Sequence, residues 1–203
     1  MLLSLMACNG IYDDPKDMSA GNSSGQSFAY LDAKSYTEWH YIDLKTKTVT
    51  TLYYCDSLSL PADWDIALHR YDVRTNGGAA IETAFSNLEE LQTAVKNGTY
   101  RMPPDTAWQE DTWDSIVVDM STMQQGYLTS APAIINEVLC NWLNVNLGSM
   151  PPIYTPSERV YLVRLRGGII AALRFTGYAN PNEHNTKGYI SFDYICPLEL
   201  NEE

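Results

Sequence analysis

The chain has 203 residues, of which 45% are hydrophobic and 19% are charged, as in an ordinary globular protein. This length predicts one domain whose core needs no metal or disulfide to hold it. The formal net charge of -12, with 25 acidic residues against 13 basic ones, argues against a protein that binds nucleic acid by neutralising phosphates.

The first eight residues form a short apolar segment that ends in Leu-Met-Ala-Cys, with Cys8 last. This resembles the end of a bacterial lipoprotein signal, in which the cysteine is acylated after cleavage. A complete secretory signal has a basic start and a longer apolar stretch, so residues 1–8 are interpreted as a truncated signal. An acylated Cys8 would anchor the protein to a membrane, because no later apolar run approaches about 18 residues.

Residues 9–27 are polar and rich in serine, glycine and asparagine, which predicts a flexible tether. The acidic pair Asp13-Asp14 in this stretch resembles a surface-export signal of some Gram-negative lipoproteins. The remaining residues, 28–203, are predicted to form the folded domain.

The first part of the domain favours β-hairpins. Residues 36–44 and 48–55 are rich in aromatic and β-branched residues and are separated by a short Lys-Thr-Lys turn, which predicts the first hairpin. Residues 64–73 alternate as a third strand, and Gly77 and Gly78 predict a tight turn after it. Residues 79–84 are then expected to return as the hairpin partner of that strand.

Two helices are predicted within this β pattern. Ser86 begins a capping box, Leu88, Leu91 and Val95 share one helical face, and Asn97-Gly98 ends the segment. The second helix is expected over residues 130–146, with Ser130 as its cap, Pro132 in its first turn and Gly148 after its end. Its apolar stripe comprises Ile134, Ile135, Val138, Leu139, Trp142 and Leu143.

Four further strands complete the prediction. The run Ile116-Val117-Val118 indicates a buried strand over residues 113–119. Gly167-Gly168 predicts a hairpin between two later strands. The fold class is therefore mostly β, an antiparallel sheet domain with two short inserted helices. The later strands are expected at residues 159–165, 169–176 and 188–196.

No pattern in the chain nominates an enzyme. His40, His69 and His184 are not at metal-ligand spacing, and neither a nucleophile elbow, a P-loop nor a dinucleotide fingerprint is present. Cysteines occur at positions 8, 55, 140 and 196 without a Cys-x-x-Cys motif, which argues against a zinc site. Two of the last three could form a disulfide, or all three could remain free buried thiols, and the sequence does not decide between these.

Three of the seven methionines, Met120, Met123 and Met150, fall at the ends of predicted elements between Asp119 and Tyr154. A methionine there can fill a gap in the core or face the mouth of a pocket. Residue chemistry alone leaves both roles open.

A family resemblance bears on that choice. The sequence Trp-Asp-Ile-Ala-Leu-His-Arg-Tyr-Asp-Val-Arg-Thr-Asn-Gly-Gly at 64–78 resembles the signature of the HmuY-like haem-binding lipoproteins. Asp119–Met123, Leu139–Trp142 and Met150–Tyr154 are similar to later blocks of the family, and the similarity covers most of residues 36–196 in order. The resemblance implies a mostly β, hand-shaped domain that grips one haem between protruding elements.

The resemblance also implies candidate ligands. The founding member of the family uses two axial histidines, whereas several relatives use two methionines. This chain has no histidine between Trp113 and Tyr154, where the ligands of the family fall. Met123 and Met150 are therefore the predicted pair. The alternative first ligand is Met120, which strand alternation places on the core face with Ile116 and Val118. Tyr127 and Tyr154 are predicted neighbours of the ring, or simple core residues.

From this we expect a haem-capturing lipoprotein on the surface of the bacterial outer membrane. It would bind haem b, preferably in the ferrous form, because thioethers are soft ligands. The propionates of the haem would face solvent or a nearby arginine. It would take haem, with host haemoproteins as one source, and pass it to a TonB-dependent outer-membrane receptor. The alternative is the same fold binding another porphyrin, a glycan or a protein, with the methionines only structural.

Overall fold

The structure, a computed structural model, describes residues 26–146, 148–149 and 151–200. The predicted signal segment with Cys8, nearly all of the predicted tether, and Met150 lie outside the described residues. The first strand, β1 (Gln26–Asp32), begins two residues before the predicted start of the domain. Within the described ranges, no helix is both long enough and apolar enough to cross a membrane.

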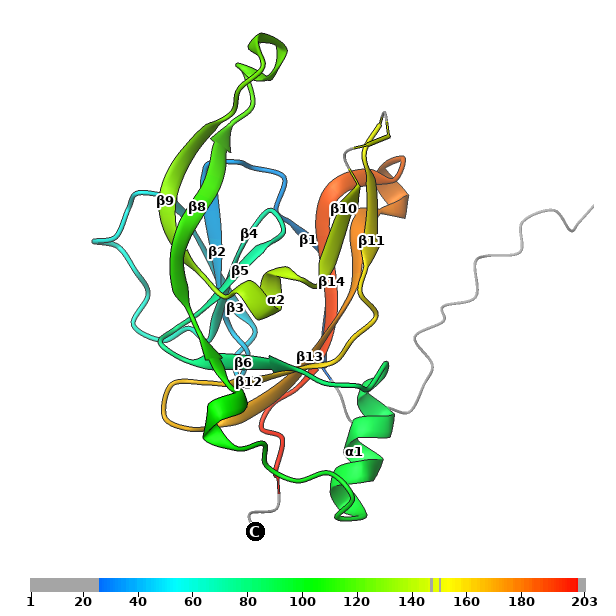
Figure 1. Ribbon diagram of the computed structural model, residues 1–203. Helices are drawn as coiled ribbons and strands as arrows, with labels where there is room; N and C mark the ends of the chain where they lie inside the picture. Colours follow the sequence, from blue (N-terminus) through cyan, green and yellow to red (C-terminus); the bar gives the residue numbers. More distant parts are fainter. Residues whose placement is uncertain (1–25, 147, 150, 201–203) are drawn as a thin grey trace, which may run out of the picture.

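Two antiparallel sheets form the centre of the molecule (Figure 1). Their facing sides hold the largest hydrophobic cluster, which includes Ile42 and Leu68 from one sheet and Phe175 and Phe192 from the other. Burial of these apolar faces is the main stabilising contribution to the fold. The mostly β, antiparallel prediction is thus confirmed.

The four-stranded sheet has the order β3-β2-β4-β5. Its β2–β3 hairpin confirms the first predicted hairpin. The predicted single strand over residues 64–73 is wrong, because the chain reverses at Arg70-Tyr71 and makes two paired strands. All four residues of β4 are buried, so alternation could not reveal where that strand ends. The strands are β2 (Glu38–Asp43), β3 (Thr48–Tyr53), β4 (Ile66–His69) and β5 (Asp72–Thr75).

The six-stranded sheet has the order β1-β14-β13-β12-β6-β7. The prediction that residues 79–84 pair with the preceding strand is wrong, since β6 pairs with β12 and β7. Just before β6, where the chain passes close to the end of β12, a Cβ on Gly78 would lie 2.2 Å from the carbonyl oxygen of Arg164, so only glycine fits. The Gly167-Gly168 hairpin between β12 and β13 is confirmed. The strands are β6 (Ala79–Glu82), β7 (Gln109–Glu110), β12 (Tyr161–Arg164), β13 (Ile170–Asn180) and β14 (Thr186–Ile195).

Helix α1 (Leu88–Lys96) covers the outer face of the six-stranded sheet. Asn87, rather than the predicted Ser86, is the N-cap, and its side chain accepts a hydrogen bond from the backbone N–H of Glu90 at 2.7 Å. The predicted face is confirmed, because Leu88, Leu91 and Val95 are its buried residues. A 3₁₀ turn, η1 (Asp105–Ala107), follows.

The predicted helix over residues 130–146 is wrong. A strand, β9 (Thr129–Ile135), pairs with β8 (Thr112–Asp119), and Pro132 lies opposite Ser115. Every second apolar residue of this hairpin packs on the outer face of the four-stranded sheet, so tertiary pairing outweighs the helical pattern. The packed residues are Ile116, Val118, Ala133 and Ile135.

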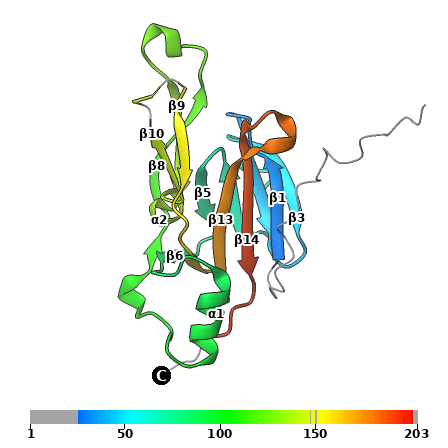
Figure 2. The same ribbon diagram turned by 90° about the vertical axis from the view of Figure 1, so that its right-hand side faces the viewer.

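Only one turn of the predicted helix exists, as α2 (Glu137–Cys140). The side chain of Asn136 caps it and accepts a hydrogen bond from the N–H of Leu139 at 3.1 Å. The chain then forms a second hairpin from β10 (Leu143–Asn146) and β11 (Ile153–Pro156). Both hairpins project toward the same end of the molecule, away from α1 (Figures 1 and 2).

Candidate functional site

The tip of the β8–β9 hairpin presents a methionine to solvent. After β8 the Asp119 carboxylate accepts hydrogen bonds from the backbone N–H and the hydroxyl of Ser121, both at 2.8 Å. A short 3₁₀ turn, η2 (Met123–Gln125), follows and ends at Gly126, whose φ of 90° suits glycine. Met123 is 54% exposed and belongs to none of the three hydrophobic clusters of the described residues. Its side chain is therefore not needed to fill the core.

The position of Met120 differs from the expectation that strand alternation places its side chain on the core face. Strand β8 ends at Asp119, and its pairing register shifts between Val117 and Asp119, so strand alternation does not extend to Met120. Its side chain is half-buried, and it too is absent from the hydrophobic clusters. The argument that assigned Met120 to the core therefore no longer separates it from Met123.

The two predicted ring neighbours lie on different hairpins. Tyr127, 57% exposed, is near the β8–β9 tip, and its hydroxyl donates to the side-chain oxygen of Gln125 at 3.1 Å. Tyr154 is half-buried on β11, where its ring centroid lies 5.0 Å from that of Tyr178. Sequence reasoning missed Leu128 and Ile153, which are 42% and 54% exposed on the same two hairpins. Both hairpins thus present exposed apolar side chains.

Strand β5 and the β4–β5 turn before it contact the roots of the two hairpins. The backbone N–H of Asn136, just after β9, donates to the carbonyl oxygen of Val73 at 2.8 Å. The indole of Trp142, just before β10, donates to the carbonyl oxygen of Tyr71 at 2.9 Å. In Figures 1 and 2 this turn lies beside the roots of the hairpins, below their tips. The predicted single strand over residues 64–73 concealed this turn.

Arg70, the first residue of this turn, is only 9% exposed. Its guanidinium carbon lies 4.2 Å from the ring centroid of Tyr36 and 5.8 Å from that of Tyr178. Its Nη1 donates to the carbonyl oxygen of Lys34 at 2.8 Å, whereas its buried Nε has no hydrogen-bond partner among the described residues. The buried hydroxyl of Tyr178 also lacks a partner, and burial raises the pKa of that phenol.

The histidines are engaged elsewhere. The ring nitrogens of His69 lie 3.1 Å from an Asp72 carboxylate oxygen and 2.8 Å from the Tyr36 carbonyl oxygen. Nδ1 of His40 lies 2.9 Å from the hydroxyl of Thr51, and burial lowers the pKa of its imidazole. His184 is exposed beside η3 (Pro181–Glu183). Among the described residues, no three His, Cys, Asp or Glu side chains converge on a possible metal position.

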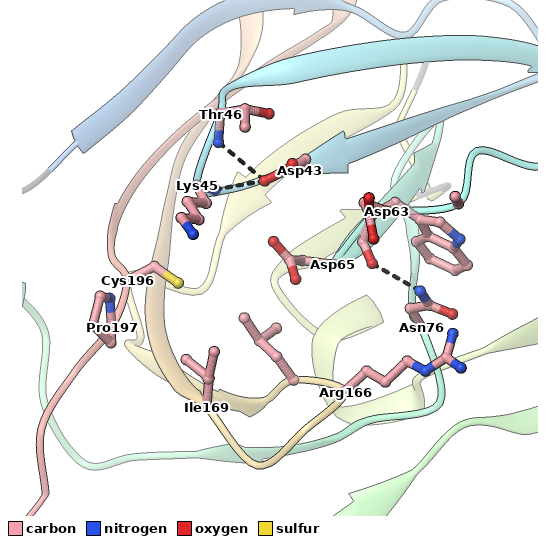
Figure 3. Close-up of a pocket in the computed structure, with 13 residues that line it drawn as sticks. Asp43, Lys45, Thr46, Asp63, Asp65, Asn76, Arg166, Ile169, Cys196 and Pro197 are labelled. Atoms are coloured by element: carbon pink, nitrogen blue, oxygen red, sulfur yellow. Dashed lines mark hydrogen bonds between the residues drawn. The ribbon is translucent and has the colours of Figure 1, made fainter.

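A cavity of about 930 Å³ lies at the opposite end of the two sheets (Figure 3). The carboxylate of Asp65 and the thiol of Cys196 point into it from different walls. Burial raises the pKa of Cys196 to about 11, so this thiol stays protonated near neutral pH. Sequence reasoning did not predict this cavity, because its walls come from turns that only the paired sheets bring together. Cys196, Cys55 and Cys140 are all free thiols.

Comparison with known proteins agrees with this architecture. The sequence profile of the HmuY protein family matches residues 35–194. A solved structure from Bacteroides vulgatus, assigned as a HmuY-like haem-binding protein, is 40% identical, with a TM-score of 0.75 over 87% of this chain and 93% of that one. A Bacteroides fragilis protein, assigned as a lipoprotein, is 39% identical, with a TM-score of 0.74 over 86% and 90% of the two chains.

A more distant structure, the apo HmuY analog of Tannerella forsythia, shares the fold at 24% identity, with a TM-score of 0.70 over 86% of this chain and 96% of that one. No protein with a curated description matches the chain. The profile match spans both sheets and both hairpins, and the 40% identical relative covers most of the chain. The chain therefore belongs to the HmuY family.

Proposed function

We propose that this protein captures haem between the β8–β9 and β10–β11 hairpins, with Met123 and Met150 as axial ligands. The observation that carries the proposal is Met123, a 54% exposed thioether at a hairpin tip in a member of a family with haem-binding proteins. Its sulfur serves no packing role in the core. Met150 follows β10 in sequence and lies outside the described residues, so its part rests on the family resemblance.

The residues present at the hairpin end suit a haem. The porphyrin ring is large and apolar, and Tyr127, Leu128 and Ile153 offer exposed apolar surface on both hairpins. Haem, when bound, supplies an iron that accepts axial ligands, and a neutral thioether is a soft donor that favours the reduced metal. Because His40 and His69 are buried and hydrogen-bonded, thioether ligation is the better match. Ferrous haem b is then the preferred ligand.

The cellular role follows from the same proposal. Cys8, if acylated, would hold the protein at the outer membrane with its folded domain on the cell surface. A surface haem-binding protein of this kind would take haem, host haemoproteins being one source, and pass it to a TonB-dependent outer-membrane receptor. A relative assigned as a lipoprotein supports the anchor.

A haem titration tests the proposal. Full-length protein is titrated with haem, with and without dithionite, and compared with Met123→Ala, Met150→Ala and the control Met102→Ala. Met102 is 36% exposed and lies outside both hairpins. We expect a saturable, shifted Soret band at about one equivalent, stronger binding of ferrous haem, and altered spectra in the first two variants only.

Two results would count against the proposal in different ways. If the Soret band does not shift, the fold serves another ligand, such as a different porphyrin, a glycan or a protein. If haem binds but both methionine variants retain the wild-type spectrum, the ligands are wrong while haem binding stands.

A further inference from the structure

Arg70 is energetically unusual among the described residues. It is the only lysine, arginine or carboxylate residue in their buried set, although the chain as a whole carries a net charge of -12. No carboxylate oxygen of the described residues lies within 4.0 Å of its guanidinium, and its nearest acidic neighbour in sequence, Asp72, is bonded to His69. Burying a charge without an opposite charge is costly.

The backbone of Arg70 adds to that cost. Its φ of 54° lies in the left-handed region, where the Cβ of a non-glycine residue comes too close to the following carbonyl oxygen. Strained backbone and unpaired buried charge gather at sites that bind ligands. Both occur here in one residue of a two-residue turn.

Local contacts account for only part of the guanidinium. Stacking on Tyr36 and the bond from Nη1 to the Lys34 carbonyl oxygen use one face and one edge. Within the part of the chain that the structure describes, Nε has no hydrogen-bond partner, and neither has the hydroxyl of the neighbouring Tyr178. Native proteins leave few buried polar groups unsatisfied, so two neighbouring ones point to a missing acceptor.

The position of this pair relates it to the hairpins. The Tyr178 ring contacts Tyr154 of β11 at 5.0 Å and Tyr71 at 6.1 Å, between ring centroids. The turn that carries Arg70 lies beside the roots of the hairpins and below their tips (Figures 1 and 2). A flat ligand held at the tips would therefore direct its inner edge toward the turn.

We propose that Arg70, assisted by the hydroxyl of Tyr178, binds a carboxylate of the ligand. This inference rests on the proposed function, because a haem carries two propionate carboxylates on one edge of its ring. The planar guanidinium matches a carboxylate, and the phenol adds a second donor. The carboxylate replaces the ion partner that the protein itself does not provide, and it orients the ring with its acidic edge inward.

A ligand comparison tests the proposal. Binding of haem and of iron protoporphyrin IX dimethyl ester, which lacks both charges, is measured for wild type, Arg70→Gln, Tyr178→Phe and the control Arg166→Gln. Arg166 is exposed on the β12–β13 turn at the other end of the molecule. We expect wild type and Arg166→Gln to prefer the free acid by about tenfold or more, as for a hydrogen bond to a charged group. Arg70→Gln should reduce that preference to about twofold, and Tyr178→Phe should reduce it by a smaller factor.

Metal-free protoporphyrin IX and its dimethyl ester, followed by fluorescence, repeat the comparison without an iron ligand. Equal binding of acid and ester by wild type would overturn the inference, and so would an unchanged preference in folded Arg70→Gln. If Arg70→Gln does not fold, the wild-type ester comparison and Tyr178→Phe decide.

The failures of the two proposals are distinguishable. If haem binds and Met123→Ala alters its spectrum while the ester preference is absent, only the role of Arg70 is lost. If neither haem nor metal-free porphyrin binds, both proposals fall.

Discussion

At the hairpin end, Met123, Tyr127 and Ile153 each expose more than half of their surface, at 54%, 57% and 54%. At the cavity end, the carboxylates of Asp43 and Asp65 accept hydrogen bonds from the backbone of nearby turns. Asp43 accepts hydrogen bonds from the N–H groups of Lys45 and Thr46, at 2.8 and 3.0 Å, and Asp65 accepts one from Leu44 at 2.8 Å. Groups that hold the fold together therefore line the cavity.

This difference favours the hairpin end as the functional one. Met123 lies outside the three hydrophobic clusters, and the Nε of Arg70 is one of five buried side-chain atoms of the described residues that have no hydrogen-bond partner. Cavity volume alone would instead direct attention to the opposite end. Three stability experiments test this comparison.

The largest effect is expected at Trp142, which is fully buried and stacks on Phe175 with 4.6 Å between ring centroids. Trp142→Ala should lower the free energy of unfolding by about 3–5 kcal/mol, because it leaves a cavity and removes the bond to Tyr71. Met123→Ala should change it by no more than about 0.5 kcal/mol. Urea denaturation followed by circular dichroism measures both.

The matched control for Trp142 is Trp113, a tryptophan on β8 that is 75% exposed. Trp113→Ala should cost less than about 1 kcal/mol. A loss of stability in Met123→Ala comparable to that in Trp142→Ala would mean that Met123 is a packing residue, and the contrast between the two ends would disappear.

A smaller effect is expected at Asn136, where the two hairpins join. This residue is fully buried, and its amide nitrogen donates at 3.0 Å both to the Gln109 carbonyl oxygen and to an Asp111 carboxylate oxygen. Asn136→Ala removes the α2 cap as well, so we expect a loss of about 1–3 kcal/mol in the free energy of unfolding. The control Asn141→Ala, an exposed residue at the other end of α2, should have little effect. Equal losses would show that Asn136 does not anchor the hairpins.

The fold could be predicted from the sequence only where local turn chemistry determines it. Short turns with lysine and threonine or paired glycines predicted the β2–β3 and β12–β13 hairpins, because turn chemistry is local. Residues 130–146 were misassigned because Ile134, Ile135 and Leu139 fit a helical stripe, whereas their true partners lie in β8 and the sheets. Only tertiary pairing decides such a case.

The candidate site divides in the same way. Met123 was chosen as a candidate ligand from family resemblance and side-chain chemistry, and this choice stays a prediction. Arg70 could not be identified from the sequence as a candidate site residue, because it is distinguished only by its burial and by the absence of a carboxylate near it among the described residues. Both are properties of residues that meet only in the fold: Tyr36, Tyr178 and the β4–β5 turn.

The smallest expected effect compares one carboxylate from each end by pH. Burial raises the pKa of Asp65 at the cavity, while hydrogen bonds from Ser121 lower the pKa of Asp119 at the hairpin. Asp65 therefore stabilises the fold fully below its ordinary pKa of 3.8 and less as pH rises through its folded-state pKa. Asp119 stabilises the fold above 3.8, and this contribution is lost as pH falls through its lowered pKa.

The two asparagine variants should consequently respond to pH in opposite directions. Relative to wild type, Asp65→Asn should gain stability as pH rises from about 3 to 7, whereas Asp119→Asn should lose stability over the same range. Unfolding free energies at several pH values measure this, and each variant serves as the control of the other. If both variants responded alike, burial would not distinguish the carboxylates of the two ends. The acidic groups of the cavity would then be as accessible as those at the hairpin tip, and the cavity would again be a candidate ligand site.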